Sequence, residues 1–307
     1  MLRLAARAAI LAACLCGPAI AQGMVDPQTL SATQPLTPEQ RKKVADFFSD
    51  KAERLATANP EDIGAVRKEV IDLLKSPALK DVCRRECAAE LVRAFKPLLA
   101  GNGEQRLLRA TNVFIIARHA PVNDTMAMLL DAADPAVQQD AAVRVAASAQ
   151  LPLAIRAGQF AGPQAEALAK RAAAIGKAET NWIAAAHDAE AVIEALRTKG
   201  ISPAQAESIA MMLGGTVNDL TTRTFSGGQP DLINALQRAL LGIRNQTSEV
   251  AATARAKLFT AIGPSLDKVA GMKGKVPAAF GSASMTTIFE SVTNTAELLN
   301  TVRSARK

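Results

Sequence analysis

Cys83 and Cys87 are the side chains whose type and spacing most directly suggest chemistry. Their separation of four residues places both thiols on one face of a helix, together with Leu79 and Leu91. One interpretation is a pair of small buried core residues. A second is a local disulfide, which would be strained or would lie at a distorted turn, because a helix holds the two Cα atoms near the upper limit for a bridge. A third is half of a metal site.

The metal interpretation has little support because the missing ligands are not in place. The chain has only two histidines, His119 and His187, and neither lies in an HExxH arrangement or at a matching distance from the cysteines. The CxxCH pattern of haem attachment does not occur. We therefore expect no metal and no cofactor.

Signatures of two enzyme classes occur only as fragments. Residues 265–268 read SLDK, the SxxK spacing of penicillin-binding enzymes, but the companion KTG and SDN elements are missing. Residues 226–229 read SGGQ, as in transport ATPases, without a GxxxxGKS/T phosphate loop. The sequence also lacks a GxSxG elbow for acyl transfer. We assign no catalytic residue and expect a protein that is not an enzyme.

The N-terminal residues have the organisation of a signal peptide. Arg3 and Arg7 precede a short apolar run, and Ala19-Ile20-Ala21 supplies the small residues that signal peptidase accepts. We therefore expect residues 1–21 to be removed and the mature protein to be periplasmic or secreted.

Residues 11–14 read LAAC and form a competing lipoprotein box, which would anchor the protein at Cys14. No later segment reaches the roughly 20 apolar residues that a transmembrane helix needs, so no membrane-spanning segment is expected.

Charge and composition narrow the range of partners. Loss of the leader removes two arginines and no acidic residue, which lowers the net charge from +7 to +5. This mild basic excess permits peripheral contact with an anionic envelope surface, either polysaccharide or lipid headgroups. Nucleic acid is not expected outside the cytoplasm. The hydrophobic content of 49% supports a real core, whereas 3% aromatic residues disfavour a stacking platform for sugars or bases.

Cap residues followed by proline recur along the chain and predict the starts of helices. Thr37 can cap a helix that begins at Pro38, and Gln40 completes a capping box. Comparable starts are expected at Asn59-Pro60, Ser76-Pro77, Asp134-Pro135, Gly162-Pro163 and Ser202-Pro203. No stretch alternates convincingly with period two, so the expected fold class is all-α without strands.

Two helical segments can be laid on one another. Cys83–Leu91 matches Val137–Val145 in most apolar, polar and small positions, at a separation of 54 residues. This pattern, over about Asn59 to Leu153, resembles the HEAT-like α-helical repeat family. The resemblance implies a solenoid of stacked antiparallel helical hairpins in the N-terminal half, each about 40 residues long.

The remaining segments complete the expected organisation. Residues 22–36 are rich in Pro, Gln, Thr and Ser and are predicted to be a flexible leader. Residues 37–220 form the repeat-like domain, and the polar loop 221–230 is the candidate boundary. Residues 231–307 form a C-terminal helical segment that packs on the same core or separately, and residues 263–282 are expected to be mostly loop.

The function most consistent with these features is an exported, non-catalytic helical scaffold that binds a protein partner in the cell envelope. On such a scaffold we expect an exposed basic ridge carrying Arg84, Arg85, Arg106 and Arg109. Each of these arginines can equally belong to an ordinary solvated helix face. The alternatives are a binding module for anionic envelope material and an enzyme whose site is assembled from scattered residues.

Overall fold

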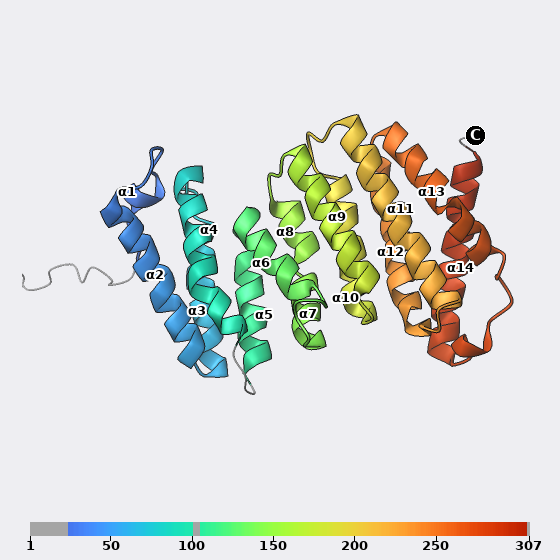
Figure 1. The fold of residues 1–307 in the computed structure, drawn as a ribbon, viewed down its shortest axis with the longest axis horizontal. Coiled ribbons are helices and arrows are strands. Elements are labelled where there is room, and N and C mark those ends of the chain that lie inside the picture. The colour runs from blue at the N-terminus through green and yellow to red at the C-terminus, as the bar shows by residue number, and fades with distance from the viewer. Residues whose placement is uncertain (1–23, 101–104, 306–307) are drawn as a thin grey trace, which may run out of the picture.

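The computed structural model describes residues 24–100 and 105–305. The predicted signal peptide and Cys14 therefore lie outside the described residues. Within the described ranges the chain forms helices and their connections and contains no strand, which confirms the all-α fold class. None of the described helices combines the length and the apolar character needed to cross a bilayer. The helices stand side by side along the long axis of the molecule, with α1 at one end and the C-terminus at the other (Figure 1).

The helices have the following bounds in chain order. They are α1 (Pro27–Leu30), α2 (Pro38–Thr57), α3 (Pro60–Leu74), α4 (Asp81–Phe95), α5 (Arg106–Ala117), α6 (Asn123–Ala133), α7 (Ala141–Ser148), α8 (Leu151–Ala157), α9 (Gly162–Ala178), α10 (Trp182–Leu196), α11 (Pro203–Phe225), α12 (Ile233–Gln246), α13 (Ala252–Ala270) and α14 (Ala283–Ser304). Short 3-10 turns are η1 (Lys96–Leu99), η2 (Pro230–Leu232), η3 (Thr247–Glu249) and η4 (Ala278–Phe280).

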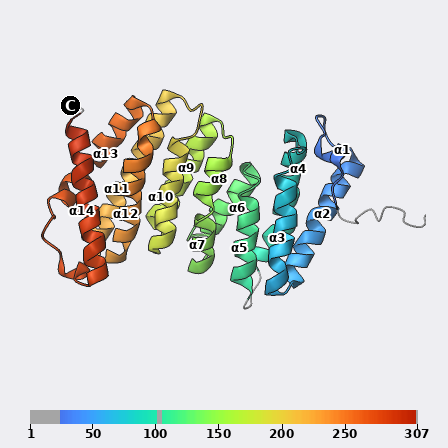
Figure 2. The ribbon, with the colours of Figure 1, turned by 180° about the vertical axis from the view of Figure 1, so that it is seen from behind.

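The helices pack in two rows. In the first row α2, α4, α6, α9, α11 and α13 each contact the next member. In the second row α3 contacts α5, α5 contacts α7, both α7 and α8 contact α10, and α10, α12 and α14 follow in order. Consecutive helices that belong to different rows run in opposite directions across the long axis, whereas α7 and α8 follow one another within the second row (Figures 1 and 2). Each pair of consecutive helices, one from each row, is thus an antiparallel hairpin.

The regular spacing along the chain lies in the starts of the first-row helices. These starts are Pro38, Asp81, Asn123, Gly162, Pro203 and Ala252. They recur about every 40 to 50 residues, the length of one helical hairpin.

The predicted match of Cys83–Leu91 to Val137–Val145 is not this repeat, since α4 belongs to the first row and α7 to the second. Asp134-Pro135 also does not start a helix. The Asp134 carboxylate accepts a hydrogen bond from the Ala136 N–H at 2.9 Å and forms a turn, and Asp140 caps α7 instead. The two segments resemble each other because both mix alanine with polar residues.

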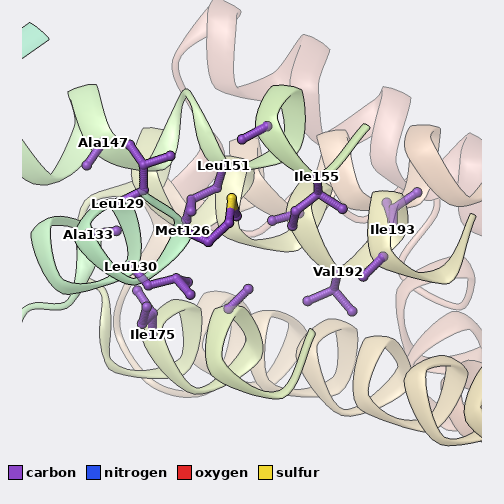
Figure 3. Close-up of a cluster of buried hydrophobic side chains, with 14 of the residues drawn as sticks. Met126, Leu129, Leu130, Ala133, Ala147, Leu151, Ile155, Ile175, Val192 and Ile193 are labelled. Atoms are coloured by element: carbon purple, nitrogen blue, oxygen red, sulfur yellow. The ribbon is translucent and has the colours of Figure 1, made fainter. Parts of the chain in front are cut away.

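A continuous apolar core lies between the rows. Figure 3 shows part of it, where Leu129 and Leu130 of α6, Ile155 of α8, Ile175 of α9 and Val192 of α10 meet. One cluster of buried apolar side chains has members from residue 25 to residue 299 and includes side chains of the C-terminal helices. Alanines on the buried faces of α9 and α10 allow these helices to approach closely.

The segment predicted to be a flexible leader contains, from residue 24 onward, helix α1 and three buried apolar side chains. Val25, Leu30 and Leu36 are buried against the first hairpins. Asp26 caps α1, and its carboxylate also forms an ion pair with Lys43 at 2.8 Å. The segment is rich in polar residues, so its composition did not indicate that three apolar side chains cover the end of the core.

The predicted loop at residues 263–282 is partly helix, because α13 continues through Gly263-Pro264 to Ala270. A side chain at Gly263 would clash with the guanidinium of Arg303, which reaches across from α14 and pairs with Asp267 at 2.6 Å. Packing against α14 therefore outweighs the helix-breaking tendency of proline.

The predicted boundary loop at residues 221–230 is also shorter than expected. Helix α11 continues to Phe225, whose ring makes edge-to-face contacts with Phe280 and Phe289. These contacts tie the end of α11 to the C-terminal helices.

Candidate functional site

A cavity of about 600 Å³ lies at one end of the helices, where three successive connections between hairpins meet. It is formed by the end of α3, the start of α4 and the residues that follow α5 and α8. Its lining residues are Leu74, Lys75, Asp81, Arg84, Arg85, His119, Pro121, Val122, Ala157 and Gln159. Helices of one row run in the same direction. The connections that lead from a second-row helix to the next first-row helix therefore lie at the same edge of the molecule.

The charged lining of this cavity is mainly cationic. The lining includes three basic residues, Lys75, Arg84 and Arg85, and one acidic residue, Asp81. Arg84 donates to the carbonyl oxygens of Leu74 and Leu79, each at 3.3 Å, and Arg85 donates to the Asp81 carbonyl at 3.4 Å. Within the part of the chain that the structure describes, none of the three cations forms an ion pair. We call Lys75, Arg84 and Arg85 the cationic cluster.

The local sequence explains why the cationic cluster forms. Helix α3 ends at Leu74, and its last carbonyls lack helical partners and carry the negative end of the helix dipole. Buried Leu79 anchors the connection, so that α4 starts beside that end. Arg84 then lies close enough to donate to the carbonyl of Leu74 at the end of α3 and to that of Leu79 in the connection, while Lys75 is the C-cap residue of α3.

His119 contributes a neutral polar group to the same cavity. It follows α5 and accepts a long hydrogen bond of 3.4 Å from the Nε of Arg118. Burial lowers its pKa to about 4, and the charges of Lys75 and Arg118 add to this effect. The imidazole is therefore uncharged at neutral pH, and the cavity owes its positive potential to the cationic cluster.

The four arginines predicted to share one ridge lie in two places. Arg106 lies at the start of α5, where it pairs with Asp140 at 3.2 Å and donates to Gln138 at 3.2 Å. Arg109 donates to Gln105 on the same helix at 3.3 Å. Arg84 and Arg85 lie instead at the opposite edge, because α4 and α5 run in opposite directions. Only these two of the four predicted arginines enter the cavity.

Cys83 and Cys87 point into the core of the first hairpins. Both are fully buried free thiols, with their sulfur atoms 3.8 Å apart in hydrogen-bond contact. The contact with Cys83 and burial raise the pKa of the Cys87 thiol. In this state the pair packs as two small core residues. The described residues hold no group of three His, Cys, Asp or Glu side chains that could bind a metal ion.

A second cavity of about 500 Å³ lies between the end of α4 with η1 and the end of α6. Its walls are mostly apolar and include Val92, Leu99 and Met128, and the neighbouring Val137 is 62% exposed. Apolar side chains left open to solvent beside a recess are typical of protein-binding surfaces.

Sequence reasoning identified Arg84 and Arg85 but missed the participation of Lys75 and His119. Lys75 is the C-cap residue of α3, and His119 lies two residues beyond the end of α5, so a basic residue at a helix end was the available signal. That signal becomes specific only when one knows which helix ends meet.

No protein-family model matches this chain, and no curated protein shows significant similarity to it. Its function must therefore be inferred from the geometry of its own residues.

Proposed function

We propose that this protein is an exported, non-catalytic scaffold that binds a protein partner in the cell envelope. The observation that carries this proposal is the packing of helices in two rows of antiparallel hairpins, in which connections of the same kind line one edge. This arrangement fits a HEAT-like α-solenoid, whose stacked repeats offer long surfaces to peptides and proteins. The step from this architecture to binding is an analogy of fold, so the surface itself must support it.

The surface supports binding of a protein rather than of a uniform polyanion. The molecule offers a cationic cavity and, separately, an apolar recess with exposed Val137. A polysaccharide or a lipid surface would make use of the cations alone. A folded partner has both carboxylates and apolar side chains and can use both recesses.

The cavity also suits binding better than a covalent reaction. Its lining contains no serine, threonine or cysteine that could act as a nucleophile, and its charged groups are mostly cations. These groups attract an anion and hold it in place. We therefore assign no reaction to this protein.

In-cell crosslinking of the tagged mature protein, followed by mass spectrometry of the envelope fraction, tests the proposal. A tagged and exported unrelated protein serves as the control. We expect one protein to be enriched, and to stay bound during washing in about 1 M salt, where the Debye length falls to about 3 Å. Recovery of polysaccharide or lipid alone, or of nothing beyond the control, would contradict the scaffold function and favour the anionic-surface module or an enzyme.

A further inference from the structure

We infer that the cavity holding the cationic cluster binds a short acidic segment of the partner protein, with Arg84 and Arg85 contacting a carboxylate. This inference rests on the proposed scaffold function and names the chemistry that the scaffold recognises. Three observations support it. The cations form no ion pair within the described residues, the arginines have unused N–H donors, and the cavity has a suitable shape.

The cationic cluster differs from basic residues that have a structural role. Arg54 pairs with Glu69 at 2.9 Å, Arg144 with Glu179 at 2.6 Å, and Arg223 with Asp219 at 3.2 Å. No described carboxylate pairs with Arg84 or Arg85 in this way. The three cations outnumber the one acidic residue of the lining, Asp81, and this excess of positive charge in a recess attracts an anion from outside.

Arg84 is held in place but keeps most of its hydrogen-bonding capacity. A guanidinium has five N–H donors, and the two bonds of Arg84 to the carbonyls of Leu74 and Leu79 are long, at 3.3 Å each. Arg85 uses one donor, in a bond of 3.4 Å. Both side chains can therefore bind a carboxylate through two parallel hydrogen bonds, the geometry that arginine provides and lysine does not.

The shape of the cavity favours a peptide over other anions. Its volume of about 600 Å³ lies within the usual range of ligand sites, and it is a recess that a flat membrane surface does not fill. Leu74, Val122 and Ala157 form apolar walls beside the cations. An acidic side chain next to an aliphatic one satisfies both parts of this lining, and the exposed Gln159 can bond the peptide backbone.

Fluorescence anisotropy with the full mature protein tests this inference. The probe is a short fluorescein-labelled peptide of alternating glutamate and leucine, compared with the same peptide carrying glutamine in place of glutamate. The variant is Arg84→Gln/Arg85→Gln. The matched control is Lys42→Gln/Lys68→Gln, which removes the same charge from exposed lysines that pair only with Asp46 and Asp72 on their own helices.

We expect the glutamate peptide to bind at least about tenfold more weakly to the arginine variant, with no change for the lysine control. The glutamine peptide should lose at least as much affinity for the unchanged protein. Equal binding of both peptides, or equal loss in both variants, would overturn the inference. Binding of phosphatidylglycerol vesicles but not of the glutamate peptide would assign the site to a lipid surface, and binding of inorganic phosphate alone would show a simple anion site.

Crosslinking in cells separates this inference from the proposed function. If the arginine variant folds, as its circular dichroism reports, and still captures the partner at the level of the unchanged protein, the acidic segment binds elsewhere and the scaffold function stands. If the unchanged protein captures no partner, the scaffold function itself fails. If the unchanged protein captures the partner and the arginine variant does not, the result supports both the acidic-segment site and the scaffold function.

Discussion

Arg144 and Arg84 both lie near the start of a helix, yet their surroundings differ. Arg144 of α7 is 9% exposed and donates to both carboxylate oxygens of Glu179, at 2.6 and 3.1 Å, and to the carbonyls of Gln138 and Gln139. Among the described residues, Arg84 of α4 donates to the carbonyl oxygens of Leu74 and Leu79 and to no carboxylate. The central hairpins therefore use arginine to fix the stack, whereas the N-terminal hairpins keep arginine available for a ligand.

Glu179, the partner of Arg144, accepts further hydrogen bonds through both its carboxylate and its carbonyl oxygen. Its carboxylate also accepts hydrogen bonds from the backbone N–H groups of Thr180 and Asn181, and its carbonyl accepts one from Arg223. Burial opposes ionisation of Glu179, but the hydrogen bonds from Arg144 and Asn181 outweigh it and lower the pKa. Arg144 thus uses four of its five N–H donors within the fold, whereas Arg84 uses two, and this is the physical difference between the two regions.

Glu179→Gln should have the largest effect, because it leaves the buried Arg144 without a counter-charge. We expect the free energy of unfolding in urea at neutral pH to fall by about 3 kcal/mol. The contribution of Glu179 is present above its unfolded pKa of 4.5 and is lost as the pH falls through its lower folded value. A loss below about 1 kcal/mol would show that the pair does not fix the stack.

Asp188→Asn tests a second buried carboxylate of the central hairpins. Asp188 is fully buried in α10, its oxygens find no hydrogen-bond partner among the described residues, and burial raises its pKa well above the usual value. A raised folded pKa means that stability is fullest below the unfolded value of 3.8 and is lost as the pH rises through the folded value. We expect the variant to be about 1 kcal/mol more stable at pH 7. Thermal unfolding at pH 7 and at a pH below 3.8 checks this expectation. A gain in stability at the lower pH only would contradict it.

His119 provides a test of the potential inside the cavity. Because its pKa is lowered to about 4, the unfolded chain binds a proton between pH 4 and 6.5 that the folded protein does not, so stability rises with pH across this interval. The imidazole resonances of His119 in NMR should titrate near pH 4, and His119→Gln should remove this part of the pH dependence. Titration near 6.5 would mean that neither burial nor the neighbouring cations act on the ring.

Arg85→Gln should have the smallest effect on folding. Arg85 is exposed and has only one long bond to a carbonyl, so the free energy of unfolding should change by less than about 0.5 kcal/mol. A loss comparable to that of Glu179→Gln would show that Arg85 is structural and would remove the distinction between the two regions.

The sequence allowed the helices to be predicted better than the site. The capping boxes of Thr37 with Gln40 and of Ser202 with Gln205 form as local chemistry requires. The helical path through Pro264 and the turn at Asp134 could not be predicted, because packing of Arg303 decides the first and an alternative hydrogen bond decides the second. Likewise, local patterns suggested Arg84 but not its proximity to His119, which depends on the shared direction of α3 and α5.

The most direct test of the account places a photocrosslinking amino acid at Lys75, on the rim of the cavity, and at the exposed Lys257 of α13 as the control. Both proteins are irradiated in cells, and the captured species are identified by mass spectrometry. We expect one partner protein to be captured through an acidic segment at position 75 and not to be captured at position 257. Capture of lipid only at position 75, or of the same proteins equally at both positions, would contradict it.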